Sequence, residues 1–155
     1  MQRIAIIDIG SNSARLVISH IYKSGAYNMV YNQKEALRLS QKVDDTNMLT
    51  EEAFASTIDT MRSFAHMCKV YQADKTIAVA TAAIRNASNG AELVAKVAAE
   101  TGSEVIAKIR RSGDIQSAED LHKTVIEALP DAPVAGDYRR LAEKILAICG
   151  GKENA

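Results

Sequence analysis

Two different spacings of apolar residues divide the chain. In its first part, short aliphatic runs over 3–9 and 14–21 are separated by a polar turn at 10–13. Two such runs joined by a short turn of small residues predict a β-hairpin. Further strands are expected over 27–31 and 35–39. The chain therefore begins with a small antiparallel or mixed meander.

From residue 50 onward the apolar spacing becomes that of a helix. Thr50 is a predicted N-cap, and two glutamates follow it in the first turn, where the helix dipole favours negative charge. Apolar residues then recur at every third or fourth position, which predicts a helix of about five turns with one buried stripe. The stripe consists of Phe54, Ile58, Met61, Ala65 and Cys68.

Strands and helices then alternate along the chain. We expect strands over 76–80 and 104–109, a helical turn over 81–85, and a helix over 90–100 that Gly102 ends. A meander followed by strand–helix alternation indicates an α/β fold, with a mixed sheet of about five strands and flanking helices.

The C-terminal part is expected to be helical from residue 112 onward. Ser117 is predicted to cap a helix that Pro130 ends, and Asp137 to cap a last helix that the glycines at 150–151 terminate. Because 155 residues is the usual size of one domain, we expect 1–155 to form a single α/β domain.

Composition excludes some classes of function. Lysine plus arginine (19) equals aspartate plus glutamate (19), so the net charge is zero, which argues against a general nucleic-acid or membrane binder. No apolar run approaches the ~20 residues that cross a bilayer, and the first residues lack the apolar core of a signal peptide. Cys68 and Cys149 form no CxxC pair, which favours reduced thiols and a cytoplasmic location.

The turn at 10–13 carries the strongest candidate chemistry. A buried strand delivers Asp8, and Gly10, Ser11, Asn12 and Ser13 follow almost at once. The N–H groups and hydroxyls of such a turn are suited to cradling phosphate oxygens, and Asp8 could hold a hydrated Mg²⁺ beside them. The alternative is a plain hairpin turn, in which the same residue types are common for conformational reasons.

A second candidate segment directly follows the strand expected over 76–80. Small residues from Thr81 onward leave room for a ligand, and Arg85 offers a planar fork of donors that matches a phosphate group. The alternative is a solvated surface arginine. The histidines at 20, 66 and 122 lack the spacing of metal ligands.

Three motifs together resemble a known family. IAIIDIGSNSARLVI, KEALRLSQ and VATAAIRNASNGAELV follow one another as in the exopolyphosphatase/guanosine-pentaphosphatase (Ppx/GppA) family of the actin-like ATPase superfamily, over residues 3–107. The resemblance implies the actin-like (ribonuclease H-like) fold of a first lobe. It also implies removal of terminal phosphate from inorganic polyphosphate or guanosine pentaphosphate, with Mg²⁺ and a water nucleophile. It places on the phosphate site Asp8, Gly10, Ser11, Asn12 and Ser13 of the first loop, and Thr81, Arg85 and Asn89 of the later motif.

The chain departs from that family in two places. Family members usually have a glycine-containing turn where this chain has residues 39–43. After Val105 they continue with a segment that supplies the catalytic carboxylate, then with a second phosphate loop and a second lobe, whereas this chain reads IAKIRRSGD. We therefore expect no catalytic residue here, and 155 residues to be too few for both lobes.

The tail over 108–150 resembles a different family. IRRSGDIQSAEDLHKTVIEALPDAPVAGDYRRLAEKIL is similar to the C-terminal segment of the nitrogenase iron protein. Because the chain has no GxxxxGK[ST] loop and no cysteines placed for an iron–sulfur cluster, only a strand and two helices are implied, not that protein's chemistry. Two likenesses in one chain predict a chimera joined within 104–109. The alternatives are a natural divergent relative and a frameshifted fragment.

These observations predict a phosphate- or polyphosphate-binding half-site with little or no turnover of its own. Phosphoryl transfer needs positioned charge on both sides of the phosphate, and the sequence shows only one side. The alternatives are a scaffold whose only property is folding, and a half-enzyme completed by a separately encoded lobe or by formation of a homodimer.

Overall fold

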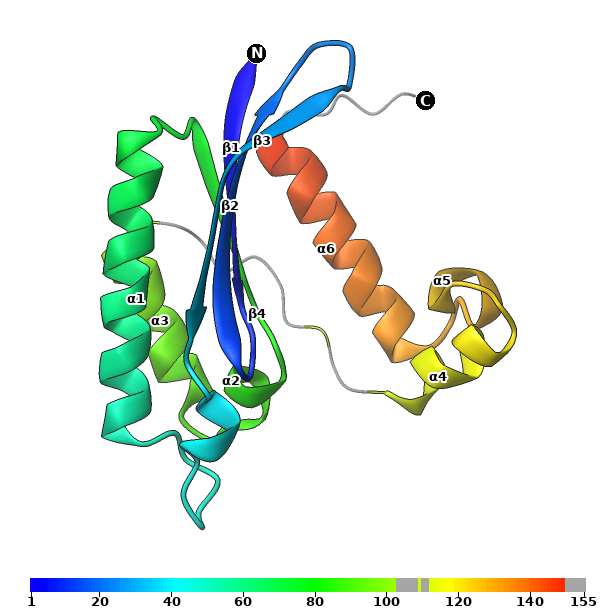
Figure 1. The fold of residues 1–155 in the computed structure, drawn as a ribbon. Helices are drawn as coiled ribbons and strands as arrows, with labels where there is room; N and C mark the ends of the chain where they lie inside the picture. Colours follow the sequence, from blue (N-terminus) through cyan, green and yellow to red (C-terminus); the bar gives the residue numbers. More distant parts are fainter. Residues whose placement is uncertain (103–108, 110–111, 150–155) are drawn as a thin grey trace. The chain divides into compact units, whose positions relative to one another are not determined.

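The computed structural model describes residues 1–102, 109 and 112–149, which fall into two compact units, Met1–Val105 and Ile106–Ala155 (Figure 1). The elements are β1 (Gln2–Ile9), β2 (Ser13–Ile21), β3 (Tyr27–Ala36), a 3-10 turn (Leu39–Gln41), α1 (Glu51–Val70), β4 (Lys75–Ala80), α2 (Ala82–Asn86), α3 (Gly90–Thr101), α4 (Gly113–Asp120), α5 (Val125–Ala128) and α6 (Pro133–Cys149). The division falls inside the stretch 104–109. The strand expected there lies outside the described residues apart from Ile109, and a single domain over 1–155 stays a prediction.

The first unit is built on a mixed sheet with the strand order β3-β2-β1-β4. β1 pairs antiparallel with β2, and β2 with β3, whereas β4 runs parallel to β1. The predicted hairpin and the mixed α/β sheet with flanking helices are therefore confirmed. Within the described residues the sheet has four strands, where the sequence suggested about five.

β3 is one continuous strand, although two short strands were predicted in its place. It pairs with the whole of β2, with a register shift at Ile18/Ser19. Its polar residues form a row of side-chain hydrogen bonds: the Tyr31 hydroxyl donates to Gln33 Oε1 (2.7 Å), and Gln33 Nε2 donates to Glu35 Oε1 (2.9 Å). An edge strand accommodates such polar positions, which is why an apolar pattern alone did not reveal it.

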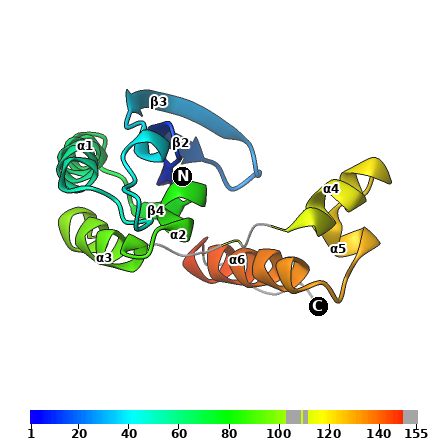
Figure 2. The same ribbon diagram turned by 90° about the horizontal axis from the view of Figure 1, so that it is seen from below.

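α1 and α3 lie side by side against one face of the sheet (Figure 2). α1 begins as predicted, with Thr50 Oγ1 accepting a hydrogen bond from Ala53 N (3.3 Å). Its buried residues are Ala53, Thr57, Met61, Phe64 and Cys68. The predicted stripe is therefore displaced around the helix. Phe54 is only half-buried and has Lys96 of α3 over its ring (4.8 Å to the centroid), because α1 packs against α3 as well as against the sheet.

α3 ends as the sequence predicted. Gly102 follows it in the left-handed conformation (φ 63°), and its N–H donates to the carbonyl of Ala98 (2.9 Å). Glycine adopts this conformation without the steric cost that a side chain brings.

Two predicted caps in the second unit are wrong. Ser117 lies inside α4, which is capped instead by Ser112 Oγ, an acceptor from Asp114 N (3.2 Å). The helix expected to run on to Pro130 is interrupted at His122, which has a positive φ of 53°. Asp137 lies inside α6, where its buried carboxylate pairs with Arg140. α6 begins at Pro133, because the first helical position is one that proline favours.

Between α4 and α6 the chain forms the short helix α5, which has its own N-cap. Thr124 Oγ1 accepts from Glu127 N, and Glu127 Oε2 accepts from Thr124 N (2.9 Å), which is a complete capping box at the start of α5. Among the described helices, none combines the length and the apolar character that a membrane span needs.

Candidate functional site

The first position of the turn between β1 and β2, Gly10, has no room for a side chain. Gly10 N donates to Ser13 O (2.9 Å), and a Cβ built on Gly10 would lie 2.9 Å from that same oxygen. Real Cβ atoms essentially never approach a backbone oxygen so closely. The tight form of the turn therefore depends on Gly10, a conformational role that the alternative of a plain hairpin turn also predicts.

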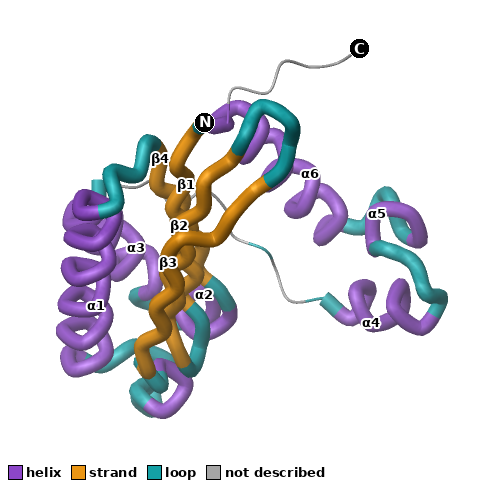
Figure 3. Tube along the Cα trace, turned by 45° about the horizontal axis from the view of Figure 1, so that its top comes forward, coloured by secondary structure: helices purple, strands orange, loops and turns teal. Residues whose placement is uncertain are grey.

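The parallel pairing of β1 with β4 brings the two candidate segments together. Thr81, the first residue after β4, donates from its N–H to Ile9 O (3.0 Å) and from its hydroxyl to the same oxygen (3.3 Å). Ser11 Oγ accepts from Ala83 N in the first turn of α2 (3.2 Å). Figure 3 shows α2 at the end of the sheet where β1 turns into β2. The two segments, predicted separately, thus lie side by side.

Asp8 lies on β1 just before this turn. Its side chain is exposed, and in the strand register it stands opposite Arg15 of β2 and Val79 of β4. Within residues 1–102, 109 and 112–149, no group of three or more His, Cys, Asp or Glu is placed to hold a metal ion. Mg²⁺ commonly binds through one or two carboxylates together with waters and substrate phosphates. A single exposed carboxylate beside the candidate turn is compatible with that mode of binding.

Arg85 lies on α2, the helix whose start bonds to Ser11. It is half-buried, and its Nε donates to Asn86 Oδ1 (3.3 Å). The structure thus places Arg85 on the segment that adjoins the turn, as the spacing of the motif suggested. Its contact with a phosphate group stays a prediction.

Asn89 is placed differently from the other predicted site residues. Its Oδ1 accepts from Leu49 N (2.8 Å) and its Nδ2 donates to Leu49 O (2.9 Å). The side chain therefore bonds to the backbone of one residue on a separate loop. These bonds tie Asn89 to the loop that carries Leu49, and its contact with a phosphate group stays a prediction.

Sequence reasoning missed a segment that adjoins both halves of the site. Asn12 O accepts from the N–H groups of Leu37 and Arg38 (both 2.9 Å), and Asn12 Oδ1 accepts from Ser40 Oγ (3.2 Å). Arg38 has a positive φ of 54°. The signal available in the sequence was the departure over 39–43, where a glycine was expected.

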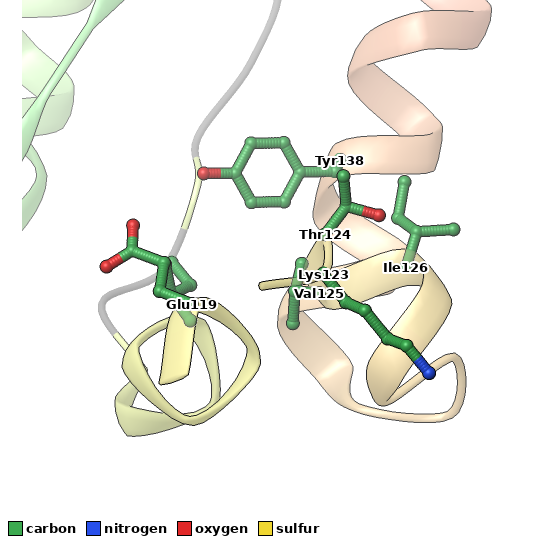
Figure 4. A pocket seen from close by; sticks show the side chains of 7 residues that line it. Glu119, Lys123, Thr124, Val125, Ile126 and Tyr138 are labelled. Carbon is green, nitrogen blue, oxygen red and sulfur yellow. The ribbon is translucent and has the colours of Figure 1, made fainter. Parts of the chain in front are cut away.

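The second unit contains a separate open cleft of about 410 Å³ (Figure 4). It is lined by Ile115, Glu119, Lys123, Thr124, Val125, Ile126 and Tyr138. Most of these side chains are apolar or aromatic, and the side chains of the acidic Glu119 and the basic Lys123 point in opposite directions in Figure 4. No sequence motif indicated this cleft.

The strand order and the paired segments define the class of protein. A mixed sheet in which a β-meander is followed by the parallel strand β4, with flanking helices, is the first-lobe architecture of actin-like ATPase-fold proteins. The chain belongs to the Ppx/GppA phosphatase family, whose model matches residues 3–109.

Solved structures and curated relatives agree with that assignment. The Aquifex aeolicus member of the Ppx/GppA family is 33% identical, with a TM-score of 0.62 over 76% of this chain and 38% of its own. An exopolyphosphatase from Cytophaga hutchinsonii is 29% identical, with a TM-score of 0.63 over 77% of this chain and 39% of its own. Exopolyphosphatase 1 of Mycobacterium tuberculosis is 29% identical over 103 residues, which are 66% of this chain and 30% of that protein. The chain thus spans about a third of the length of the curated exopolyphosphatases that it matches.

A second likeness involves a different protein. The nitrogenase iron protein of Methanospirillum hungatei is 45% identical over 62 residues, which are 40% of this chain and 22% of that protein.

Proposed function

We propose that the first unit is a phosphate-binding half-site that takes the end of a polyphosphate chain or of guanosine pentaphosphate. The observation that carries the proposal is the hydrogen bond between Ser11 Oγ and Ala83 N, which joins the turn to α2. It brings two donor-bearing segments to one edge of the sheet. A turn of small residues and an arginine fork next to it are complementary to phosphate oxygens.

The residues proposed to contact phosphate come from both segments. They are Gly10, Ser11, Asn12 and Ser13 of the turn, with Thr81 and Arg85 after β4. We propose that Asp8 holds Mg²⁺ through a carboxylate oxygen or a bound water. When bound, the ion would offset the negative charge of the phosphate groups. Arg85 would orient the chain end through bidentate hydrogen bonds.

A titration with tripolyphosphate and Mg²⁺, followed by phosphorus NMR, tests the proposed site. Asp8→Ala and Arg85→Ala are each expected to weaken binding about tenfold or more, since a hydrogen bond to a charged group contributes about 1.5–3 kcal/mol. Asp59→Ala and Arg62→Ala are the matched controls, because these residues form an exposed ion pair on α1 (3.3 Å). Equal binding by all four variants would overturn the assignment of Asp8 and Arg85 to the site. No binding by the unmodified chain would leave only a folding scaffold.

We propose that this half-site has little or no phosphohydrolase activity by itself. In-line attack by water needs stabilisation of charge on the attacking and leaving sides of the phosphate, and the residues proposed here come from one side only. A phosphate-release assay with polyphosphate and Mg²⁺ should give no release above background. Sustained turnover would contradict the proposal, whereas turnover that appears only in a dimer, detected by sedimentation, would favour completion by a second copy.

We also propose that the chain joins parts of two ancestral proteins near 104–109 and that it acts in the cytoplasm. The 62-residue likeness to the nitrogenase iron protein and the division into two compact units support the join. Long-read sequencing of the source transcript tests it. A single uninterrupted message from one locus supports a natural fusion, whereas separate messages for the two parts would oppose it.

A further inference from the structure

The segment 37–49, which we refer to as the strap, lies between β3 and α1 in the chain. Hydrogen bonds join it to the proposed phosphate turn at one end and to the residues that follow Arg85 at the other. Its first end is bonded to the turn. The N–H groups of Leu37 and Arg38 share Asn12 O, and Ser40 N donates to Ser11 O (3.1 Å). The start of the strap therefore follows the backbone of the turn closely.

The second end of the strap is bonded to the junction between α2 and α3. Asn47 Nδ2 donates to Asn86 O (2.7 Å), and Asn47 O accepts from Ser88 N (2.9 Å). Leu49 exchanges two hydrogen bonds with the side chain of Asn89. Four hydrogen bonds thus hold this end to the residues that directly follow Arg85.

Between its two ends the strap has a defined conformation. Val43 and Leu49 form an isolated β-bridge, and Asp44 Oδ1 accepts from Thr46 N (2.8 Å) and Met48 N (3.0 Å). These hydrogen bonds lower the pKa of Asp44, the bond from the Thr46 hydroxyl most of all. Leu39 and Leu49 anchor the strap in the core, with 0% and 3% of their surfaces exposed. A segment held in this way keeps the turn and the junction between α2 and α3 at a fixed distance from each other.

We propose that the strap positions α2, and with it Arg85, at a set distance from the phosphate turn, and that Asn89 is a positioning residue rather than a phosphate ligand. The functional part of this inference rests on the phosphate site proposed above. An amide side chain suits the role because it accepts and donates at once, so it bonds to both the N–H and the carbonyl of Leu49.

Two variants separate this role from a general contribution to folding. Asn89→Asp keeps the shape and the acceptor for Leu49 N but loses the donor to Leu49 O. Asn47→Gly keeps the left-handed backbone of that position (φ 60°) but removes the bond to Asn86 O. The matched control is Asn28→Asp on β3, an exposed asparagine paired with His20 at the other end of the sheet.

The measurements are amide hydrogen exchange without ligand and tripolyphosphate affinity with Mg²⁺. In both strap variants we expect exchange to accelerate about two- to tenfold at Ala83, Arg85 and Ala87, because an intramolecular hydrogen bond contributes about 0.5–1.5 kcal/mol. Amides of β1 and β2 should keep their wild-type exchange rates. Affinity should fall about tenfold, and the control should match the wild type in both measurements.

Each result decides between the two roles. Unchanged exchange at α2 would overturn the proposal, and acceleration spread equally over the sheet would show a general loss of stability and overturn it too. Accelerated exchange at α2 with unchanged affinity would overturn the functional part. If the wild type binds no tripolyphosphate, the proposed phosphate site fails, and the exchange data still decide whether the strap holds α2.

Discussion

Gly90 offers the sharpest test of the packing beside the site. It is the first residue of α3, and a Cβ built on it would lie 1.8 Å from Ile84 O and 2.9 Å from Ile84 C. Carbon and oxygen in contact lie more than 3 Å apart, so Gly90→Ala must push α2 and α3 apart. Gly113 is the matched control, since it also begins a helix and has nothing within 4 Å of its built Cβ.

Gly90→Ala and Gly113→Ala are expected to differ in their effect on the free energy of unfolding. Overpacking a well-packed interior costs about 1–3 kcal/mol, and the gain from replacing glycine by alanine in a helix, about 1 kcal/mol at most, only partly offsets it. Gly90→Ala should therefore lower the free energy of unfolding of the first unit by about 1–2 kcal/mol. Gly113→Ala should leave that of the second unit unchanged or raise it by up to about 1 kcal/mol.

Urea unfolding followed by amide peak intensities in ¹H–¹⁵N spectra measures each unit separately. A lower midpoint for the amides of α2, α3 and the sheet in Gly90→Ala, with no loss in Gly113→Ala, is the expected pattern. An unchanged midpoint in Gly90→Ala would refute the close approach of Gly90 to Ile84, because no backbone tolerates a contact of 1.8 Å without moving.

Three further predictions concern charge and capping. Hydrogen bonds lower the pKa of Asp44 below its ordinary value of 3.8, so the stability that its carboxylate contributes is present above that pH and is lost as the pH falls below it. In urea titrations, the difference in free energy of unfolding between the wild type and Asp44→Ala should therefore shrink in acid. A difference that stays constant with pH would contradict the role of these hydrogen bonds. Thr124→Ala removes one half of the capping box at α5 and should destabilise the second unit by about 1 kcal/mol in thermal melts, with Ser117→Ala, inside α4, as the control expected to melt close to the wild type. Arg62→Ala breaks the exposed ion pair to Glu100 (2.8 Å) between α1 and α3 and should cost less than about 1 kcal/mol; a larger loss would mean that this pair contributes more than exposed pairs do.

The parts of the fold that local chemistry determines could be predicted from the sequence. The hairpin follows from two aliphatic runs around a glycine–serine turn, the start of α1 from Thr50, and the end of α3 from Gly102. The caps at Ser117 and Asp137 were wrong for a local reason as well. By residue type, Ser112 and Thr124 are as good N-caps as Ser117 and Asp137. The chain breaks between α4 and α5 at His122, which has a positive φ that its residue type does not signal.

The candidate site was predictable only in part. The proximity of the turn to Thr81 follows once β4 lies parallel to β1, because parallel strands carry their carboxyl ends to the same edge. The hydrogen-bond partners of Asn89 could not be inferred from the sequence, since Leu49 lies 40 residues away. An asparagine that binds a ligand and one that bonds to a distant loop look alike in a sequence. The role of the strap was hidden for a related reason: each of the bonds at its second end joins residues about 40 positions apart and uses a backbone group, which every residue carries.

The contacts that build the site join residues far apart along the chain. Ser11 bonds to Ala83 and Thr81 to Ile9, and in both pairs the partners are separated by 72 positions. Closing so long a loop costs entropy that only later contacts repay, so the site is complete only when the whole first unit has folded. A ligand of this site would bind the native state alone and raise its stability by mass action. Thermal stabilisation by tripolyphosphate would therefore report occupancy of the site even in a chain that turns over no substrate.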